Sequence, residues 1–426
     1  MTTHRSLESV VIKTSLWNRV NEPRQYIQYV DVSAVSSSRL EIVIPASIDG
    51  KKAPSRAQKI IQTGDVLFAT IRPSLKRIAK VSQKLDGEVA STAFCVLRPN
   101  PKIINSNFLF FSVCNDSFVS SVAEHEAGAS YPAVRDKDIF ERTIWVPDLQ
   151  IQSKIARCVD VLHRATLRQL DLIEQAETLK HAAMSQLFTR GLRGEAQKET
   201  EIGLMPYSWN PKFILELCDI WSGGTPRKSV AEYWVGDIPW VSGKDLKLPA
   251  LENAIDHISQ AGVEAGSRIA PKGAVLLLVR GMGLAKDLPV AVIKRPMEFN
   301  QDVKALVTRG QYSGEFLRSA IYAGKDRLLS QIVPSAHGTI TLNLNDVESF
   351  KVACPSDKNE ANQVVIMTDA LERKIALHQQ KKLVLDELFR SLLHKLMTGE
   401  ISVEDLDLSA LTHEEPQPQT EAEVQS

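Results

Sequence analysis

The spacing of apolar residues divides this chain into two kinds of segment. Residues 1–148 and 202–356 carry short apolar or alternating runs bounded by Gly, Pro, Asp and Asn, a pattern typical of strands. Residues 149–188 and 357–397 repeat apolar residues every three or four positions without an internal Pro or Gly, which predicts two long helices. At about 1.5 Å per residue, forty helical residues would extend roughly 60 Å.

Each long segment carries a narrow apolar stripe over about five heptads, which favours a coiled coil. A domain precedes each helix, so only an antiparallel pair would place the two domains at opposite ends. The alternative is two helices that each pack on their own domain. The stripes comprise Ile151, Ile155, Val159, Leu162, Thr166, Leu170, Ile173, Ala176, Lys180, Ala183 and Leu187, and Val364, Thr368, Leu371, Ile375, His378, Lys382, Leu385, Phe389, Leu392 and Leu396.

The two halves of the chain also repeat one another at an offset of 208 to 210 residues, too long for a solenoid. In each half a polar loop precedes a strand-like run that ends in proline, Asp138–Pro147 or Asp346–Pro355, and a long helix follows. Leu187-Phe-Thr and Leu396-Met-Thr correspond near the helix ends. Such a duplication suits a molecule that grips two sites a fixed distance apart.

Further elements follow from the local patterns. We predict strands at Tyr26–Val32, Leu40–Ile44, Val66–Ile71, Ala93–Leu97 and Ala274–Val279, with helices at Asn107–Val122 and Ser313–Ser330. The predicted class is α+β, with two similar domains and two long helices. The expected boundaries are a first domain at 1–148, a helix at 149–190, a linker at 191–201, a second domain at 202–356, a helix at 357–398 and a disordered acidic tail at 399–426.

Composition permits a nucleic-acid partner without establishing one. The chain has zero net charge, but residues 399–426 hold eight acidic side chains and no Lys or Arg, so the rest carries +8. Residues 1–149 hold 19 basic and 15 acidic side chains, and residues 202–356 hold 17 and 15. Both globular segments are therefore mildly basic, which is compatible with DNA binding.

The expected location is the cytoplasm. The five cysteines are dispersed, which favours reduced thiols. No apolar run approaches the roughly 20 residues that span a membrane, and the first residues lack the apolar stretch of a signal peptide.

An ordered set of motifs resembles the specificity subunits of Type I restriction-modification enzymes. In the first half these are Ala53–Ala57, Gly64–Pro73, Ser91–Phe94 and Ser130–Val134; in the second they are Ile220–Lys228 and Tyr233–Leu246, with Gln186–Gly191, Gly203–Trp209 and Leu388–Ile401 around the helices. Each motif alone is weak, but their order matches the family over residues 10 to 405.

The resemblance implies a non-catalytic subunit that reads an asymmetric bipartite DNA site, one half per target recognition domain. It also implies that the helices set the unread spacer and dock two methyltransferase subunits, which restriction subunits join. This chain would then carry no cofactor, and S-adenosylmethionine, ATP and Mg²⁺ would belong to the partner subunits. The chain departs from the family pattern where Arg-Gly-Ser is replaced by Arg280-Gly-Met.

Candidate DNA-binding residues lie in polar loops of both domains. Basic side chains can reach phosphates or guanine edges, glutamine can pair with adenine, and glycine allows close approach of the backbone. The alternative for each loop is an ordinary solvated turn or strand connection. The candidates are Arg56, Arg72, Lys76, Arg77, Ser130 and Tyr131 in the first domain, and Ser222, Gly223, Gly224, Thr225, Arg227, Lys244, Arg280, Gln301, Gly338 and Thr339 in the second.

Catalytic motifs are missing from the sequence. It contains no Asp/Asn-Pro-Pro-aromatic run, no phosphate-binding G-x-x-x-x-G-K-[ST] loop and no His/Cys cluster with zinc spacing. We therefore expect no catalytic residue and no metal site. Two other functions remain open at this stage, an autonomous DNA-modifying enzyme and an adaptor whose duplicated domains bind protein.

Overall fold

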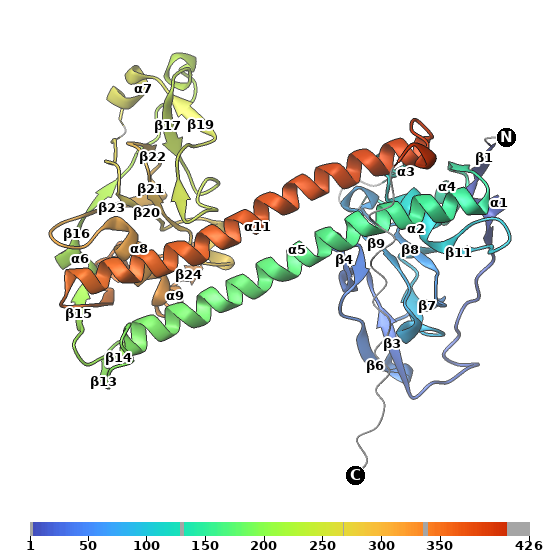
Figure 1. Ribbon diagram of the computed structural model, residues 1–426, viewed down its shortest axis with the longest axis horizontal. Coiled ribbons are helices and arrows are strands. Elements are labelled where there is room, and N and C mark those ends of the chain that lie inside the picture. The colour runs from blue at the N-terminus through green and yellow to red at the C-terminus, as the bar shows by residue number, and fades with distance from the viewer. Residues whose placement is uncertain (1–2, 128–131, 267, 335–339, 407–426) are drawn as a thin grey trace, which may run out of the picture. The chain divides into compact units, whose positions relative to one another are not determined.

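The computed structural model describes residues 3–127, 132–266, 268–334 and 340–406. The chain forms two compact units, Met1–Asp171 with Gln379–Ser426, and Leu172–His378. Each unit contains one mixed domain, part of helix α5 (Leu149–Arg190) and part of helix α11 (Lys358–Thr398) (Figure 1). The predicted α+β class with two long helices is confirmed.

The first domain is built on two four-stranded sheets. Their strand orders are β2-β11-β8-β9 and β6-β3-β10-β7. The strands of the first sheet are β2 (Val11–Ile12), β8 (Val66–Ala69), β9 (Ile78–Lys80) and β11 (Phe94–Pro99); those of the second are β3 (Tyr26–Val30), β6 (Ala46–Asp49), β7 (Ala57–Ile60) and β10 (Val89–Ser91). Smaller pairs join β1 (Thr3–Ser6) to β12 (Thr143–Val146) and β4 (Val35–Ser36) to β5 (Glu41–Ile42), and the helices are α1 (Leu7–Val10), α2 (Ser106–Cys114), α3 (Asp116–Ala123) and α4 (Asp136–Phe140).

The second domain contains a five-stranded sheet, β16-β23-β20-β21-β18, and a three-stranded sheet, β19-β17-β22. The strands are β16 (Cys218–Ser222), β17 (Ile238–Val241), β18 (Ala250–Leu251), β19 (Asp256–Ile258), β20 (Val275–Leu278), β21 (Val290–Ile293), β22 (Glu298–Phe299) and β23 (Val303–Thr308). The remaining elements are the β13 (Gln197–Thr200) to β14 (Gly203–Pro206) hairpin, the β15 (Asn210–Phe213) to β26 (Lys351–Cys354) pair, the β24 (Val333–Pro334) to β25 (Ile340–Thr341) pair, α6 (Ile214–Leu217), α7 (Gln260–Glu264), α8 (Gly314–Ala323), α9 (Lys325–Leu329) and α10 (Leu344–Glu348).

Strand register shows that the two domains are copies of one fold. Val66 of β8 faces Leu97, and Val275 of β20 faces Leu306, so both partners are shifted by 209 residues. The parallel pair β3 with β10 in the first domain corresponds to β17 with β22 in the second, which also has a parallel pair, β18 with β21. The turn before the central strand contains a glycine at φ 87° in both domains, Gly64 and Gly273, a conformation that glycine adopts without strain.

Several predicted elements are shorter or broken. The strand-like runs Asp138–Pro147 and Asp346–Pro355 open in helices α4 and α10, and only their last residues form strands. Asp138 explains the first case, because its carboxylate accepts a hydrogen bond from Arg135 N at 2.8 Å and so caps α4. The predicted strand Leu40–Ile44 is reduced to Glu41–Ile42.

The two predicted single helices are each split in two. Asn115 is extended, at ψ 136°, and its side chain accepts from Ser117 N, so it ends α2 and caps α3. In the second domain the break between α8 and α9 falls at Gly324, where a Cβ atom would lie 2.8 Å from the Phe350 ring.

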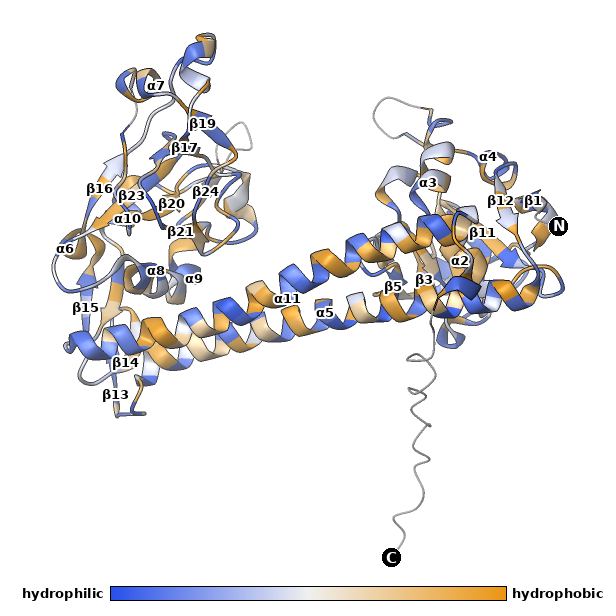
Figure 2. Cartoon of the chain, turned by 45° about the horizontal axis from the view of Figure 1, so that its top comes forward, coloured by the Kyte–Doolittle hydropathy of each residue, from blue (hydrophilic) through white to orange (hydrophobic). Residues whose placement is uncertain are grey.

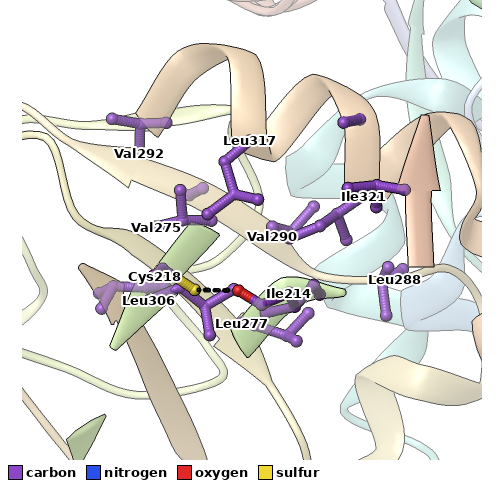
Figure 3. Packing of buried hydrophobic residues seen from close by; sticks show 14 of the residues in the cluster. Ile214, Cys218, Val275, Leu277, Leu288, Val290, Val292, Leu306, Leu317 and Ile321 are labelled. Carbon is purple, nitrogen blue, oxygen red and sulfur yellow. Dashed lines mark hydrogen bonds between the residues drawn. The ribbon is translucent and has the colours of Figure 1, made fainter. Parts of the chain in front are cut away.

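The core of the second domain lies between its five-stranded sheet and α8. Figure 3 shows Leu317 and Ile321 of α8 directed at Val275, Val290 and neighbouring strand residues, all of them buried. Burial of each such side chain contributes roughly 1.5–3 kcal/mol. Cys218 lies in the same core, where its thiol donates to Ile214 O at 3.3 Å and burial raises its pKa to about 12.

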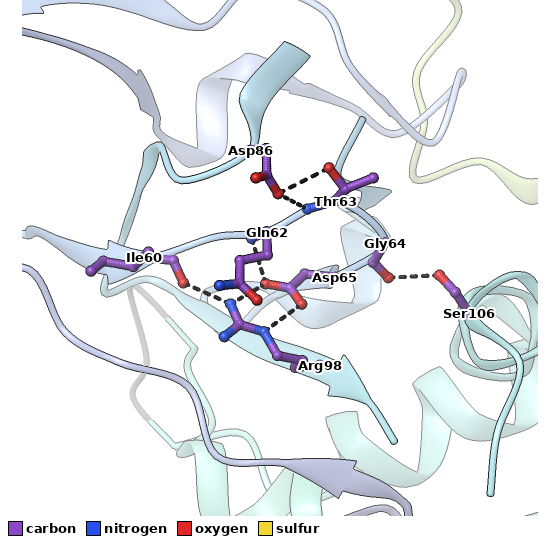
Figure 4. A network of polar contacts seen from close by, with 8 residues as sticks. All are labelled: Ile60, Gln62, Thr63, Gly64, Asp65, Asp86, Arg98 and Ser106. Atoms are coloured by element: carbon purple, nitrogen blue, oxygen red, sulfur yellow. Dashed lines mark hydrogen bonds and ion pairs between the residues drawn. The ribbon is translucent and has the colours of Figure 1, made fainter. Parts of the chain in front are cut away.

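In the first domain a polar network fixes the start of β8 (Figure 4). The Arg98 guanidinium donates two hydrogen bonds to the buried Asp65 carboxylate, at 2.9 and 2.8 Å. Gln62 N donates to the same carboxylate, and Ser106 Oγ donates to Gly64 O at 2.6 Å. These bonds satisfy the buried charge, as a low-dielectric site requires.

Within each unit the segments of α5 and α11 run antiparallel. In the second unit Lys180 of α5 pairs with Glu372 of α11. Gly191, just after the end of α5, lies beside Glu360 at the start of α11, since a Cβ at Gly191 would be 3.2 Å from the Glu360 side chain. In the first unit the rings of His163 and Phe389 lie 5.7 Å apart. Every residue of the two predicted stripes is buried or half-buried, and Figure 2 shows apolar and polar residues alternating along both helices.

The ends of the helices also complete the domain cores. Met184, Leu187 and Phe188 of α5 belong to the core of the second unit, and Leu393, Leu396 and Met397 of α11 belong to that of the first. The repeated Leu-Phe-Thr and Leu-Met-Thr motifs therefore perform the same packing role. None of the helices in the described part of the chain has the length and hydropathy to cross a membrane.

Candidate nucleic-acid interface

In the first domain several predicted loops meet at the end of β8. Thr70 N donates to Ala93 O at 2.8 Å, and Thr70 O accepts from Val134 N at 2.9 Å. Arg72 N donates to Pro132 O at 2.8 Å, and Thr92 N donates to Arg56 O at 2.8 Å. We call this set the first loop edge, comprising Arg56, Thr70–Arg72, Thr92–Ala93 and Pro132–Val134.

The second domain reproduces this edge at the end of β20. Val279 N donates to Asp302 O at 2.9 Å, and Val279 O accepts from Leu342 N at 2.8 Å. Gly281 N donates to Ile340 O at 2.9 Å. Isolated bridges also correspond, Ile71 with Ala133 and Arg280 with Thr341. The second loop edge therefore comprises Ser222–Arg227, Val279–Gly281, Gln301–Asp302 and Ile340–Leu342.

Basic candidates of the first domain fall into two groups. Arg56 and Arg72 are exposed on the edge, and Arg72 adopts a left-handed conformation at φ 50°. Lys76 instead forms an ion pair with Asp116, and burial lowers its pKa, with the positive charge of Arg390 acting in the same direction. Arg77 donates to Val32 O at 2.8 Å, within its own domain. Ser130 and Tyr131 lie outside the described residues.

In the second domain the Ser222–Arg227 loop is held tightly against β22. Gly224 N donates to Phe299 O at 3.0 Å, and Trp240 Nε1 donates to Gly224 O at 3.1 Å. A Cβ atom at Gly223 would lie 2.1 Å from Phe299 O, so only glycine fits there. Close packing of the backbone against the sheet thus explains Gly223.

The polar side chains of this edge are partly organised already. Thr225 Oγ1 donates to Gln301 Oε1 at 2.6 Å, which links two loops 76 residues apart. Lys304 Nζ donates to Ser222 Oγ at 2.8 Å. Lys244 is not part of the second loop edge and pairs with Asp256 at 2.6 Å. Arg227 and Arg280 are exposed. Gly338 and Thr339 lie outside the described residues.

Sequence reasoning missed one element of each edge, a short 3₁₀ turn directly after the central strand. These turns are η3 (Pro73–Leu75) and η6 (Met282–Ala285). Each exposes one large apolar side chain, Leu75 at 49% and Met282 at 66%. The 209-residue repeat would have aligned the starts of the turns, but periodicity does not reveal elements this short.

The loop edges offer hydrogen-bond donors, acceptors and positive charge on loops that are joined by backbone hydrogen bonds. Over the described ranges, no group of three or more His, Cys, Asp and Glu side chains could hold a metal ion. Exposed arginines and hydroxyl groups next to glycine-rich backbone are the groups that bind phosphates and base edges.

Known proteins resemble the chain over most of its length. Residues 13–178 and 206–387 match the family described as Type I restriction modification DNA specificity domain. The HindI Type I restriction enzyme specificity subunit of Haemophilus influenzae is 23% identical, over 82% of this chain and 89% of that protein.

Two solved structures share the architecture. A chain from a study of complex assembly and conformational transition in the type I R-M system is 26% identical, with a TM-score of 0.55 over 94% of this chain and 98% of that one. The S subunit of a Type I restriction-modification system from M. genitalium shares the fold at 14% identity, with a TM-score of 0.57 over 93% and 96%. Two matches to one family, which together cover most of the sequence, show that this chain belongs to the Type I restriction-modification DNA specificity subunits.

Proposed function

We propose that each domain reads one half of an asymmetric, bipartite DNA site through its loop edge. The observation that carries this proposal is the recurrence of one backbone framework with different side chains. Thr70, Ile71 and Arg72 of the first edge correspond to Val279, Arg280 and Gly281 of the second. Two copies of one backbone framework that display different side chains would recognise different DNA sequences.

Within the edges, we propose that the exposed cations make the first contacts. Arg56, Arg72, Arg227 and Arg280 can bind phosphates or the O6 and N7 atoms of guanine. Polar groups already engaged in the fold, such as Lys76 and Arg77, would contribute charge or hold the loops. The remaining proposed contacts are Ser130, Tyr131, Ser222, Gly223, Gly224, Thr225, Lys244, Gln301, Gly338 and Thr339.

We propose that α5 and α11 set the unread spacer and carry two methyltransferase subunits. A stiff helical spacer would favour half-sites separated by about one DNA turn, roughly 34 Å, or a multiple of it, because both edges would then face the same side of the duplex. Helix α11 exposes Ile366, Leu377, Val384 and Leu388, apolar groups available to a partner helix.

Subunits of this family are non-catalytic, so methyl transfer and cleavage belong to their partner subunits. The partners of such specificity subunits are DNA, methyltransferase subunits and restriction subunits. In the proposed complex, S-adenosylmethionine, ATP and Mg²⁺ would bind to those partners, and the target adenine would be flipped out of the duplex by the methyltransferase. We propose that the complex acts in the cytoplasm.

The test is to exchange residues 202–356 for the second domain of another specificity subunit and to map methylated adenines in the host genome. One half of the recognised sequence should change, while the other half and the spacer length should persist. Exchange of residues 1–148 is the reciprocal control. A change in both halves would refute independent reading. Deletion of residues 149–188 is less informative, because it would remove Met184, Leu187 and Phe188 from the second core.

A further inference from the structure

A cavity of about 410 Å³ opens in the first unit, close to the first loop edge. It is lined by the turn between β4 and β5, the end of η3, the junction of α2 and α3, and the helices α5 and α11. Lys76, which directly follows η3, lies four residues after Arg72 of the edge, and its N–H donates to Pro73 O at 2.9 Å. We call this space the basic cavity, because its wall carries the cations Lys76, Lys382 and Arg390.

The charges in the wall of the basic cavity do not balance. Lys76 pairs with Asp116, and Lys382 pairs with Asp386 at 2.6 Å. Arg390 is exposed, and no carboxylate in the described part of the chain forms an ion pair with it. Three cations against two carboxylates leave one net positive charge. Burial lowers the pKa of Lys76, and Arg390 acts in the same direction, so an anion in the cavity would stabilise both charged groups.

The remaining polar groups of the wall are hydroxyls and a neutral imidazole. Thr166 of α5 is 7% exposed, and within the described ranges no group forms a hydrogen bond with its Oγ1. A buried hydroxyl without a partner is destabilising, so an acceptor oxygen in the cavity would stabilise it. Ser37 and Ser38, exposed on the turn between β4 and β5, offer two more hydroxyls. Burial lowers the pKa of His163, so its ring adds no charge near neutral pH.

The corresponding place in the second unit holds a large side chain. Cys114 and Tyr322 each lie nine residues after the N-cap of their helix, α2 or α8. Cys114 lines the basic cavity, whereas the centre of the Tyr322 ring lies 4.6 Å from Lys180 Nζ and 4.4 Å from Lys325 Nζ. Because the repeated fold accommodates a tyrosine at this position, it does not itself require an open space there. The basic cavity is therefore a feature of the first unit.

We propose that the basic cavity binds one phosphate group of the DNA backbone next to the first half-site. This inference rests on the proposed function, because it requires the first loop edge to lie on DNA. A phosphodiester carries one negative charge, which balances the cavity, and its oxygens accept hydrogen bonds from lysine, arginine and hydroxyl groups. The position of the cavity close to Arg72 favours DNA over an acidic side chain of a partner protein. Contact at Arg390 would place α11 itself against the duplex.

The experiment uses the full chain in complex with its methyltransferase subunits, and duplexes that contain the methylated sequence mapped in the host. Arg390→Gln removes the unpaired charge at an exposed position. It should lower affinity by roughly tenfold and reduce the slope of log affinity against log salt concentration by about one. The ratio of affinities for the target and for an unrelated duplex should not change, because a phosphate contact carries no sequence information. Arg157→Gln, at an exposed arginine of α5, is the matched control and should alter neither quantity.

Neutral phosphates connect Arg390 to one position on the DNA. A methylphosphonate is placed in turn at each phosphate within and beside the first half-site, which removes one negative charge and leaves the bases unchanged. At one position it should weaken binding by the wild-type complex roughly tenfold and have no further effect on Arg390→Gln. Thr166→Val keeps the shape of the side chain without its hydroxyl, and it should weaken binding by roughly two- to tenfold at an unchanged salt slope.

Several outcomes would overturn the inference. These are an unchanged salt slope for Arg390→Gln, no phosphate position that couples to Arg390, or a loss of discrimination between target and unrelated duplexes. Loss of methyltransferase assembly in Arg390→Gln, measured by size-exclusion chromatography, would assign the cavity to an acidic side chain of that partner instead. Failure of the proposed function is distinguishable, because the wild-type complex would then bind no sequence in preference to another.

Discussion

The two units use different side chains where α5 and α11 pack against a domain helix: aromatic rings in the first unit and charged groups in the second. In the first unit, α2, α5 and α11 meet in a cluster of rings, where Phe111 lies 6.2 Å and His163 5.7 Å from Phe389. In the second unit, α8, α5 and α11 meet at Glu372, which accepts from Lys180 at 2.8 Å and from Arg318 at 2.5 Å. We call these the aromatic junction and the ionic junction.

The junctions occupy equivalent positions in the repeat. His163 corresponds to Glu372 and Phe389 to Lys180, each pair 209 residues apart. Phe110 corresponds to Arg318, 208 residues later, because each lies five residues after the N-cap of its helix. Phe110 and Arg318 are equally buried, at 5% and 4% exposure. A duplicated fold therefore requires that the space be filled and its polar groups be satisfied, and it accepts either rings or charges there. Substitutions in the two junctions should therefore differ in how much stability they cost.

Removal of one partner from the ionic junction should have the largest effect. Glu372→Ala leaves the buried Arg318 and the half-buried Lys180 without their carboxylate, which costs roughly 3–5 kcal/mol. Because two units need not unfold together, hydrogen exchange of α8 is the appropriate measurement, with α2 as the internal control. Equal loss of protection in α2 and α8 would contradict a local role.

Truncation of a ring in the aromatic junction should cost less. Phe389→Ala leaves a cavity beside Phe111 and His163, but Phe389 is only half-buried, so we expect about 2–3 kcal/mol, below the range for a fully buried phenylalanine. Exchange in α2 should accelerate while α8 stays protected. A loss larger than that of Glu372→Ala would show that the junctions are not ranked by buried charge.

Replacement of the ionic junction by the residues of the aromatic junction tests whether the second unit requires its charges. The triple variant Lys180→Phe, Arg318→Phe, Glu372→His places the chemistry of the first unit in the second. Since buried ion groups can often be replaced by apolar residues at little cost, the triple variant should change stability by less than about 2 kcal/mol. It should be more stable than the Glu372→Ala single variant. If the triple variant were less stable than Glu372→Ala, the packing of the second unit would require the charged side chains.

The smallest expected effect is a difference in pH dependence. Burial lowers the pKa of His163 below its ordinary value of 6.5, so the folded first unit favours the neutral ring. The unfolded chain binds more protons, and protection of α2 should therefore decline as pH falls below about 6.5. His163→Phe should remove this part of the decline. A decline unaltered by this substitution would assign it to another group.

Local patterns predicted the helices well and the short elements poorly. Every residue of the two stripes is buried or half-buried, because helical periodicity is written into neighbouring residues. The helices predicted at Asn107–Val122 and Ser313–Ser330 are split, since the Asn115 side chain caps a new helix and Gly324 packs beside Phe350. A capping asparagine is visible in a sequence, but only its surroundings decide whether it ends a helix.

For the candidate site, the sequence supplied residue types but not their grouping. It singled out Arg72 and Arg77 together, yet Arg72 is exposed on the loop edge and Arg77 donates to Val32 O. It named Thr225 and Gln301 separately, and their side chains form one hydrogen bond. The roles of these residues on DNA remain proposals.

By itself, the sequence determined the duplication, the two long helices and the family, because repeats, periodicity and ordered motifs are carried by residues near one another in the chain. Only the tertiary structure decided which loops share an edge and which chemistry fills each junction. Those features join residues far apart in sequence, such as Thr70 with Ala93 and Lys180 with Glu372. Their pairing depends on strand register and helix packing, which no local pattern records.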